Sequence, residues 1–239
     1  MAESALVKSI FTLIQGVGNP EPNWYADATL IQIRQDHMRI ITGAFLAVAL
    51  SVFSTSSWAF MERYVEGVHY VKVKDATPKP GTVTEFFSFG CPHCSHLEPA
   101  VEAWLKTKPA KVKFDRVPAT WNKKFQVLAQ LYYTLESLNQ LESSMAAVFD
   151  YIHKQGKHIH SAGAAQDFLV SLGMDRAAVK QAWNAEEIDD KLRAAAAAYA
   201  RNQVRGVPAF LVNGQYQTSV SMAGSETELF KVVEFLMNK

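Results

Sequence analysis

The feature that most constrains this chain is its only pair of cysteines, Cys91 and Cys94, which are separated by two residues in a sequence of 239. Strand-forming residues precede the pair at positions 82–89, and apolar residues recur at helical spacing from position 97 onward. Pro92 suits the first turn of a helix, where the N–H that proline lacks would have no partner. The pair is therefore predicted to lie where a strand leads into a helix, with Cys91 at the helix N-terminus.

This position favours reactive sulfur chemistry over a purely structural role. The positive end of a helix dipole stabilises a thiolate, which would lower the pKa of Cys91. An inert disulfide is a weaker interpretation, because so short a loop constrains little of the unfolded chain. A third interpretation is a copper or zinc site assisted by His93 and His96. Structural zinc usually takes four protein ligands, however, and the sequence has no second cysteine pair. The sequence favours a redox-active dithiol.

The segment 38–59 has the organisation of an export signal. A basic start at Arg39 precedes an apolar run over 40–53, and the segment ends on small residues at Ser57 and Ala59. This pattern predicts a secretory signal peptide over 38–59, because the apolar run is short for a membrane span. An uncleaved anchor helix is the alternative.

Residues 1–37 lie upstream of that signal and show no sustained apolar period. They are predicted to be an extension that is disordered or not translated, with Met38 as the true start. A cytosolic tail ahead of an anchor is the competing interpretation. Sequencing of the exported protein should give Phe60 as the mature N-terminus.

The charge balance and the predicted export bound the function. A formal net charge of +1 gives no large electrostatic field of the kind that nucleic acid binding requires. Export leads to an oxidising compartment, where a disulfide persists. The dithiol can therefore be held oxidised and used as an oxidant.

The pattern along the rest of the chain alternates strands and helices. The predicted elements are strands at 70–73, 82–89 and 111–117, a helix from Pro92 to about 107 that contains Pro99, four or five helices between 121 and 205, two strands joined at Asn213-Gly214, and a helix at 226–236. Glu85 is unusual in its apolar strand. Either it is partly buried, with a raised pKa and a role as a proton carrier, or it points to solvent at a strand edge.

Three histidines, His153, His158 and His160, fall close together within the predicted helical block. Histidine is a common metal ligand, so a metal site is one interpretation. Their irregular spacing favours a solvated loop instead, and no metal site is predicted.

The order of elements resembles a thioredoxin fold, an α/β architecture, with an all-helical domain inserted into it. The chain closely resembles the DsbA family of periplasmic thiol–disulfide oxidoreductases, and the resemblance covers nearly all of residues 65–239. It is carried by four features: Glu85-Phe86-Phe87-Ser88-Phe89, Cys91-Pro92-His93-Cys94, Pro99, and Gly206-Val207-Pro208 before a hairpin. The predicted domains are the first part of the thioredoxin-like domain at 60–118, the helical insertion at 119–204 and the second part at 205–239.

The resemblance implies a role for each residue of the cysteine motif. Cys91 would be the exposed nucleophile and Cys94 the buried resolving cysteine. His93 would stabilise the Cys91 thiolate. Pro92, together with the 207–208 segment, would contribute to substrate binding.

It also implies roles for residues outside the motif. Pro208 would be cis and would present the backbone of Val207 to a substrate chain. Glu85 would be the family's buried acid beneath the active site. The family's lysine beside that acid would be Lys123 or Lys124.

The implied activity is that of a monomeric dithiol oxidase that introduces disulfides into newly exported, unfolded proteins in the periplasm. Its redox-active group would be the Cys91–Cys94 disulfide, with no other cofactor, and a membrane-bound, quinone-coupled reoxidase of the DsbB type would restore it. One alternative is an isomerase or reductant of the same fold, although no separate dimerisation domain follows the signal. The other, of a different class, is a metal-binding or chaperone module.

Overall fold

The fold is built on a single mixed sheet, seen in the computed structural model, which describes residues 63–239. The signal predicted at 38–59 and the extension predicted at 1–37 lie outside these residues. The strand order is β1-β5-β4-β2-β3, with β1 (Val71–Lys72), β2 (Thr82–Phe87), β3 (Lys113–Pro118), β4 (Ala209–Val212) and β5 (Tyr216–Thr218).

Helices lie between β2 and β3, between β3 and β4, and after β5, and all of the predicted helical regions are helical in the structure. They are α3 (Pro92–Thr107), α4 (Lys123–Ser137), α5 (Leu141–Phe149), the π-helix η1 (Asp150–Lys154), α6 (Ala162–Ser171), α7 (Arg176–Trp183), α8 (Glu186–Arg201), α9 (Val220–Ala223) and α10 (Glu226–Met237). Ser161, Asp175 and Ser225 cap α6, α7 and α10 through side-chain hydrogen bonds to backbone N–H groups. Among residues 63–239, no helix combines the length and apolar character that a membrane span requires.

The hairpin between β4 and β5 follows from the predicted Asn-Gly turn. Asn213 and Gly214 both take left-handed backbone angles, with φ of 53° and 66°. A Cβ atom at Gly214 would lie 2.4 Å from the Thr77 carbonyl oxygen, so only glycine fits there. Asn213 also accepts a hydrogen bond from the Gly81 N–H and donates one to the Leu236 carbonyl, at 2.9 and 3.0 Å.

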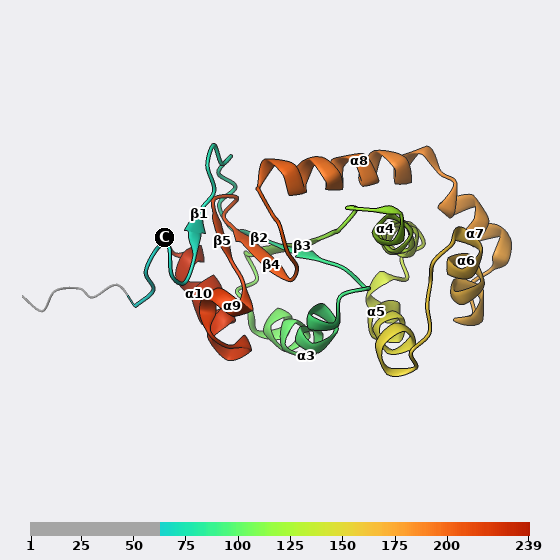
Figure 1. Cartoon of the computed structure of the whole chain (residues 1–239), viewed down its shortest axis with the longest axis horizontal. Helices are drawn as coiled ribbons and strands as arrows, with labels where there is room; N and C mark the ends of the chain where they lie inside the picture. Colours follow the sequence, from blue (N-terminus) through green and yellow to red (C-terminus); the bar gives the residue numbers. More distant parts are fainter. Residues whose placement is uncertain (1–62) are drawn as a thin grey trace, which may run out of the picture. The chain divides into compact units, whose positions relative to one another are not determined.

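The sheet is covered on both faces. Figure 1 shows α8 over one face and α3 with α10 over the other. Alternate residues of β2 supply the two cores: Val83 packs with residues of α3 and α10, while Phe86 packs edge-on against Tyr199 of α8 at 4.9 Å between ring centroids.

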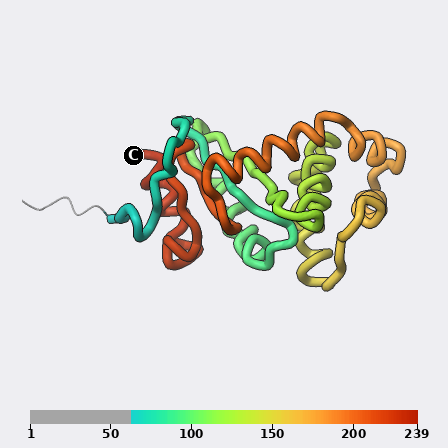
Figure 2. The backbone as a smooth tube through the Cα atoms, turned by 45° about the horizontal axis from the view of Figure 1, so that its top comes forward, coloured from blue at the N-terminus to red at the C-terminus, as the bar shows by residue number. Residues whose placement is uncertain are grey.

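The helical segment leaves the sheet after β3 and returns to it along α8, as the colour sequence of Figure 2 shows. Its core is continuous with the sheet, because Phe87, Phe89 and Cys94 belong to the same buried cluster as residues of α4 to α8. The cysteine motif therefore stands at the junction between the sheet and the helices.

Several boundaries differ from the predicted ones. β2 ends at Phe87 rather than Phe89, because the next carbonyl, that of Ser88, accepts from the Cys91 N–H and turns the chain into α3. α8 ends at Arg201, before the predicted end of the helical block at 205, because Gln203 takes a left-handed φ of 55° that terminates the helix. Within the same block, positions 141–154 divide into α5 and η1.

Candidate active site

The cysteine motif occupies the start of α3, as the sequence predicts. Cys91 is the N-cap residue, with extended backbone angles, and Pro92 is the first helical residue. The Cys91 N–H donates to the Ser88 carbonyl at 3.1 Å, which closes the turn between β2 and the helix. No side chain caps the helix, so its first N–H groups are free to face the sulfur of Cys91.

The two thiols, both reduced in this structure, have unlike surroundings. Cys91 is half-buried, whereas Cys94 is 1% exposed. A hydrogen bond from the Cys94 thiol, assisted by the N–H groups of Cys94 and His93 and opposed by burial, lowers the pKa of Cys91 to about 6. The same hydrogen bond, together with burial, raises the pKa of Cys94. The pair therefore holds one acidic sulfur at the surface and one weakly acidic sulfur beneath it.

The segment at 206–208 lies against Cys91, although 116 positions separate the two in sequence. The Cys91 thiol donates a hydrogen bond to the Val207 carbonyl oxygen at 3.4 Å. The Val207–Pro208 peptide bond is cis, as the resemblance implies. The Val207 backbone is thus held next to the reactive sulfur.

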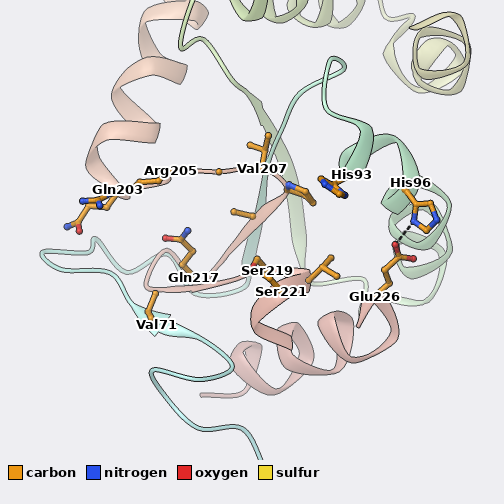
Figure 3. Close-up of a pocket in the computed structure, with 14 residues that line it drawn as sticks. Val71, His93, His96, Gln203, Arg205, Val207, Gln217, Ser219, Ser221 and Glu226 are labelled. Carbon is orange, nitrogen blue, oxygen red and sulfur yellow. Dashed lines mark hydrogen bonds and ion pairs between the residues drawn. The ribbon is translucent and has the colours of Figure 1, made fainter. Parts of the chain in front are cut away.

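A cleft of about 670 Å³ opens beside this contact. His93 and Val207 border it, and both His93 and Pro92 are exposed. In Figure 3, His96 and Glu226 lie on one side of the cleft and Gln203 and Arg205 on the other. His96 Nδ1 lies 2.6 Å from the Glu226 carboxylate, so this wall is fixed by an ion pair between α3 and α10 when the histidine is protonated.

Glu85 is buried, which decides between the two sequence interpretations: it is 1% exposed. Its partner is Arg116, which stands directly opposite it in the parallel β2–β3 register. Arg116 Nε donates to Glu85 at 2.8 Å, and its Nη2 donates to both oxygens of Glu98 at 2.9 Å. Two buried carboxylates thus share a single guanidinium below the cysteine motif.

This arrangement sets the protonation of the cluster. Burial raises the pKa of Glu85 to about 7, although the charge of Arg116 opposes the shift. Burial likewise raises the pKa of Glu98. Burial disfavours the charge of Arg116, but the two carboxylates outweigh that effect and raise its pKa. At neutral pH Glu85 is therefore poised to take up or release a proton.

Neither Lys123 nor Lys124, the two candidates for a lysine beside Glu85, lies there, because that place is taken by Arg116. Both are exposed, at the start of α4, where Asn122 caps the helix. The alternation of β3 contained the correct signal, because Val112, Phe114 and Arg116 share a face of the strand. Glu98 is a further buried acid that was not predicted, although it lies one helical turn after Cys94 and on the same side of α3.

The histidines His158 and His160 stack with ring centroids 5.0 Å apart, in an exposed loop. His153 instead contacts the backbone of Phe89. Within residues 63–239, no three His, Cys, Asp or Glu side chains are arranged to hold a metal ion.

Comparison with known proteins shows the family. A family model described as a DSBA-like thioredoxin domain matches residues 82–231. The thiol:disulfide interchange protein DsbA of Pseudomonas aeruginosa is 34% identical over 204 residues, covering 84% of this chain and 95% of that protein. DsbA of Azotobacter vinelandii is 31% identical over 207 residues, covering 84% and 97%. The crystal structure of Pseudomonas aeruginosa DsbA superposes with a TM-score of 0.70 at 34% identity, covering 73% of this chain and 93% of that one.

These likenesses confirm the predicted thioredoxin-like fold with its helical insertion. They also agree with the local chemistry, in which two neighbouring thiols of unequal acidity stand at a helix N-terminus. Such an inequality is what thiol–disulfide exchange requires, since one sulfur must be exposed as an anion and the other must leave and be protonated. The chain belongs to the DsbA family and is a protein thiol:disulfide oxidoreductase.

Proposed function

We propose that the protein is a disulfide oxidase in which Cys91 exchanges with client thiols and Cys94 resolves the pair. The observation that carries this assignment is the contrast between the half-buried Cys91, with its pKa lowered to about 6, and the buried Cys94, with its pKa raised. A stable thiolate at Cys91 favours the dithiol state of the enzyme. The enzyme disulfide is correspondingly a good oxidant.

The exchange proceeds in two balanced steps. A client thiolate attacks the Cys91 sulfur, the Cys91–Cys94 bond breaks, and Cys94 leaves as a thiolate that takes up a proton. A second client thiolate then attacks the client sulfur of the mixed disulfide and releases the Cys91 thiolate. The client gains a disulfide, and the enzyme is left with two reduced cysteines. We assign Glu85 as the proton carrier for Cys94, because its pKa of about 7 suits proton transfer at neutral pH.

The client chain is proposed to bind as an extended peptide along the cleft beside Cys91. Val207 and Pro208 line the cleft, the Val207 carbonyl contacts the Cys91 sulfur, and Pro92, the residue after Cys91, is exposed. Main-chain recognition of this kind tolerates many sequences, which suits an enzyme that acts on unfolded proteins.

Membership of the family and the predicted signal at 38–59 support a proposal for location and partners. We propose that the protein acts as a monomer in the periplasm and needs no cofactor besides the Cys91–Cys94 disulfide. A membrane-bound, quinone-coupled reoxidase of the DsbB type would regenerate that disulfide. N-terminal sequencing of the protein recovered from the periplasm should give Phe60, and a chain that retains residues 38–59 would contradict the cleavage.

The oxidase assignment predicts a high reduction potential. Equilibration with glutathione should give a value more oxidising than about −200 mV, because the Cys91 thiolate stabilises the reduced protein. The oxidised and reduced fractions can be measured by thiol alkylation after acid quenching. A potential close to that of thioredoxin, about −270 mV, would identify a reductant instead.

Replacing His93 with alanine should raise the pKa of Cys91 and make the protein a weaker oxidant. The expected increase is well below one pKa unit, since the charge of His93 is the smallest of the influences on Cys91 and its N–H remains in the variant. Thiolate absorbance against pH measures the shift directly. An increase of more than about one unit, equivalent to ~1.4 kcal/mol, would show that the imidazole and not the helix start controls the sulfur.

A further inference from the structure

His153 makes a direct contact with the loop that carries the catalytic cysteine. Its Nε2 lies 2.7 Å from the carbonyl oxygen of Phe89, two residues before Cys91. A carbonyl can only accept, so Nε2 carries the hydrogen and donates it. The bond crosses 64 positions in sequence and joins the helical segment to the turn between β2 and α3.

The other carbonyls of this turn are also held. The Phe87 carbonyl accepts from the Ala119 N–H at 2.8 Å and from the Tyr199 hydroxyl at 3.2 Å. The Ser88 carbonyl accepts from the Cys91 N–H at 3.1 Å. The bond from His153 therefore completes a series in which three successive peptide groups leading into the cysteine motif are fixed.

The backbone around His153 is unusual. α5 ends at Phe149 and passes into the π-helix η1, where the Gln155 N–H reaches back five residues to the Asp150 carbonyl at 2.9 Å. Wide turns of this kind are rare and occur frequently at functional sites. No residue of η1 is fully buried, so filling the core does not by itself account for the turn. Tyr151 and Ile152 of η1 pack partly against the core, and His153 reaches the loop that precedes Cys91.

We propose that His153 is a positioning residue that fixes the Phe89–Gly90 peptide and thereby holds Cys91 against the N-terminus of α3. This inference rests on the proposed oxidase function. The Cys91 thiolate is stabilised by the backbone N–H groups of His93 and Cys94 at the start of α3. Rotation of the peptide two residues earlier would displace the sulfur from these donors. Loss of the His153 donor therefore weakens the reduced, thiolate form more than the disulfide form, in which the bond to Cys94 already restrains Cys91.

The surroundings of His153 allow a matched set of variants. It lines a cavity of about 200 Å³ together with Gly90, Pro92, Lys124 and the stacked pair His158 and His160. His153→Gln places an amide N–H near the position of Nε2, whereas His153→Asn is one methylene shorter and does not reach Phe89. His160→Ala removes a histidine from the same cavity without touching the loop.

The test measures the glutathione equilibrium and the unfolding free energy of both redox forms for each variant of the full chain. His153→Asn should destabilise the reduced form more than the oxidised form and should lower the oxidising equilibrium constant by up to about fivefold, the limit reached if one net hydrogen bond is lost from the reduced form alone. His153→Gln and His160→Ala should stay within about twofold of the wild type by the same measure.

Two results would overturn the proposal. Equal destabilisation of both redox forms by His153→Asn, with an unchanged equilibrium constant, would mean that the histidine only supports the helical segment. A His153→Gln variant as impaired as His153→Asn would mean that the donated hydrogen bond is not what matters. If His153→Asn does not fold, His153→Phe, which keeps the ring beside Phe149 and lacks the donor, takes its place. A reducing wild-type potential would instead refute the oxidase function, and would leave the comparison among variants intact.

Discussion

Replacing Cys94 with alanine is expected to abolish turnover and to raise the pKa of Cys91 from about 6 toward the ordinary value for cysteine, about 8.5. Turnover stops because no intramolecular disulfide can form. The pKa rises because the hydrogen bond from the Cys94 thiol is the largest influence that lowers it. Alkylation of Cys91 by iodoacetamide across a pH series reports the shift, since only the thiolate reacts.

Cys94→Ser is the matched control for that result. A serine hydroxyl still donates to the Cys91 sulfur. The pKa of Cys91 should therefore be well below the value it has in Cys94→Ala, although turnover is lost in both variants. If the two variants titrate alike, the Cys94 thiol does not control Cys91, and the N–H groups of α3 must account for the low value.

The depressed pKa of Cys91 also sets how stability varies with pH. A group that is more acidic in the folded state stabilises it above the unfolded pKa, and this contribution is lost as the pH falls through the folded pKa, about 6. For the reduced protein the gain is on the order of 1 kcal/mol at pH 7 and is complete above about pH 8.5. The oxidised protein has no thiolate and gains nothing. In denaturant melts, the free energy of unfolding of the reduced form should therefore rise relative to that of the oxidised form between pH 5 and pH 8. Free energies of unfolding that vary in parallel with pH would contradict the mechanism.

Replacing Arg116 with methionine should destabilise the protein by about 3–5 kcal/mol at neutral pH, because it leaves the buried carboxylates Glu85 and Glu98 without their cation. Both acids would then stay protonated in the folded state to a higher pH. A carboxyl whose folded pKa lies above its unfolded pKa reduces stability as the pH rises between the two values. The deficit should therefore be smaller at pH 5 than at pH 7 in denaturant melts of the oxidised form.

Arg176→Met is the control for that variant. Arg176 pairs with Asp167 at 2.8 Å, the same separation as Arg116 and Glu85, but both side chains are largely exposed. Solvent screens such a pair, so little change in stability is expected. An Arg116→Met variant that is as stable as Arg176→Met would show that the buried cluster is not ionised in the way described.

Glu85→Gln should stabilise the protein, whereas Arg116→Met should destabilise it. The glutamine imitates the protonated acid, keeps an acceptor for Arg116 Nε and leaves Arg116 paired with Glu98. Because the pKa of Glu85 is raised to about 7, the native carboxylate opposes folding at neutral pH, and its removal should stabilise the protein by up to about 3 kcal/mol. If Glu85 carries the proton for Cys94, the same variant should also reduce client thiol oxidation near neutral pH. Stabilisation with unchanged oxidation rates would leave Glu85 as a buried acid without a catalytic role.

The elements around the cysteines could be predicted because each has a local signal. Pro92 indicates a helix start and Asn213-Gly214 indicates a hairpin, and in both cases the structure agrees. These residues act through backbone geometry or hydrogen bonds within a few positions of themselves. Structural features that depend only on residues a few positions apart can therefore be predicted from the sequence alone.

Contacts between elements were harder to predict. The burial of Glu85 stayed open because its partner is set by strand register, and Arg116 comes 31 positions later. Helical periodicity does not separate α5 from η1, because apolar positions such as Val148 and Ile152 suit an α-helix and a wider turn alike. The bond from His153 to Phe89 links segments 64 positions apart, and no local pattern indicates it.

The place of β4 in the sheet has a consequence for how the chain matures. β4 lies between β5 and β2, so it joins the β1–β5 edge to the β2–β3 pair, yet it follows the whole helical segment in sequence. A chain emerging N-terminus first therefore exposes Cys91 and Cys94 long before their central strand exists, and closing so long a loop slows assembly. During that interval the enzyme is an unfolded chain with free thiols, as its proposed clients are. Under the proposed function, mature copies are expected to oxidise newly made ones, so that the supply of active enzyme depends on enzyme already present.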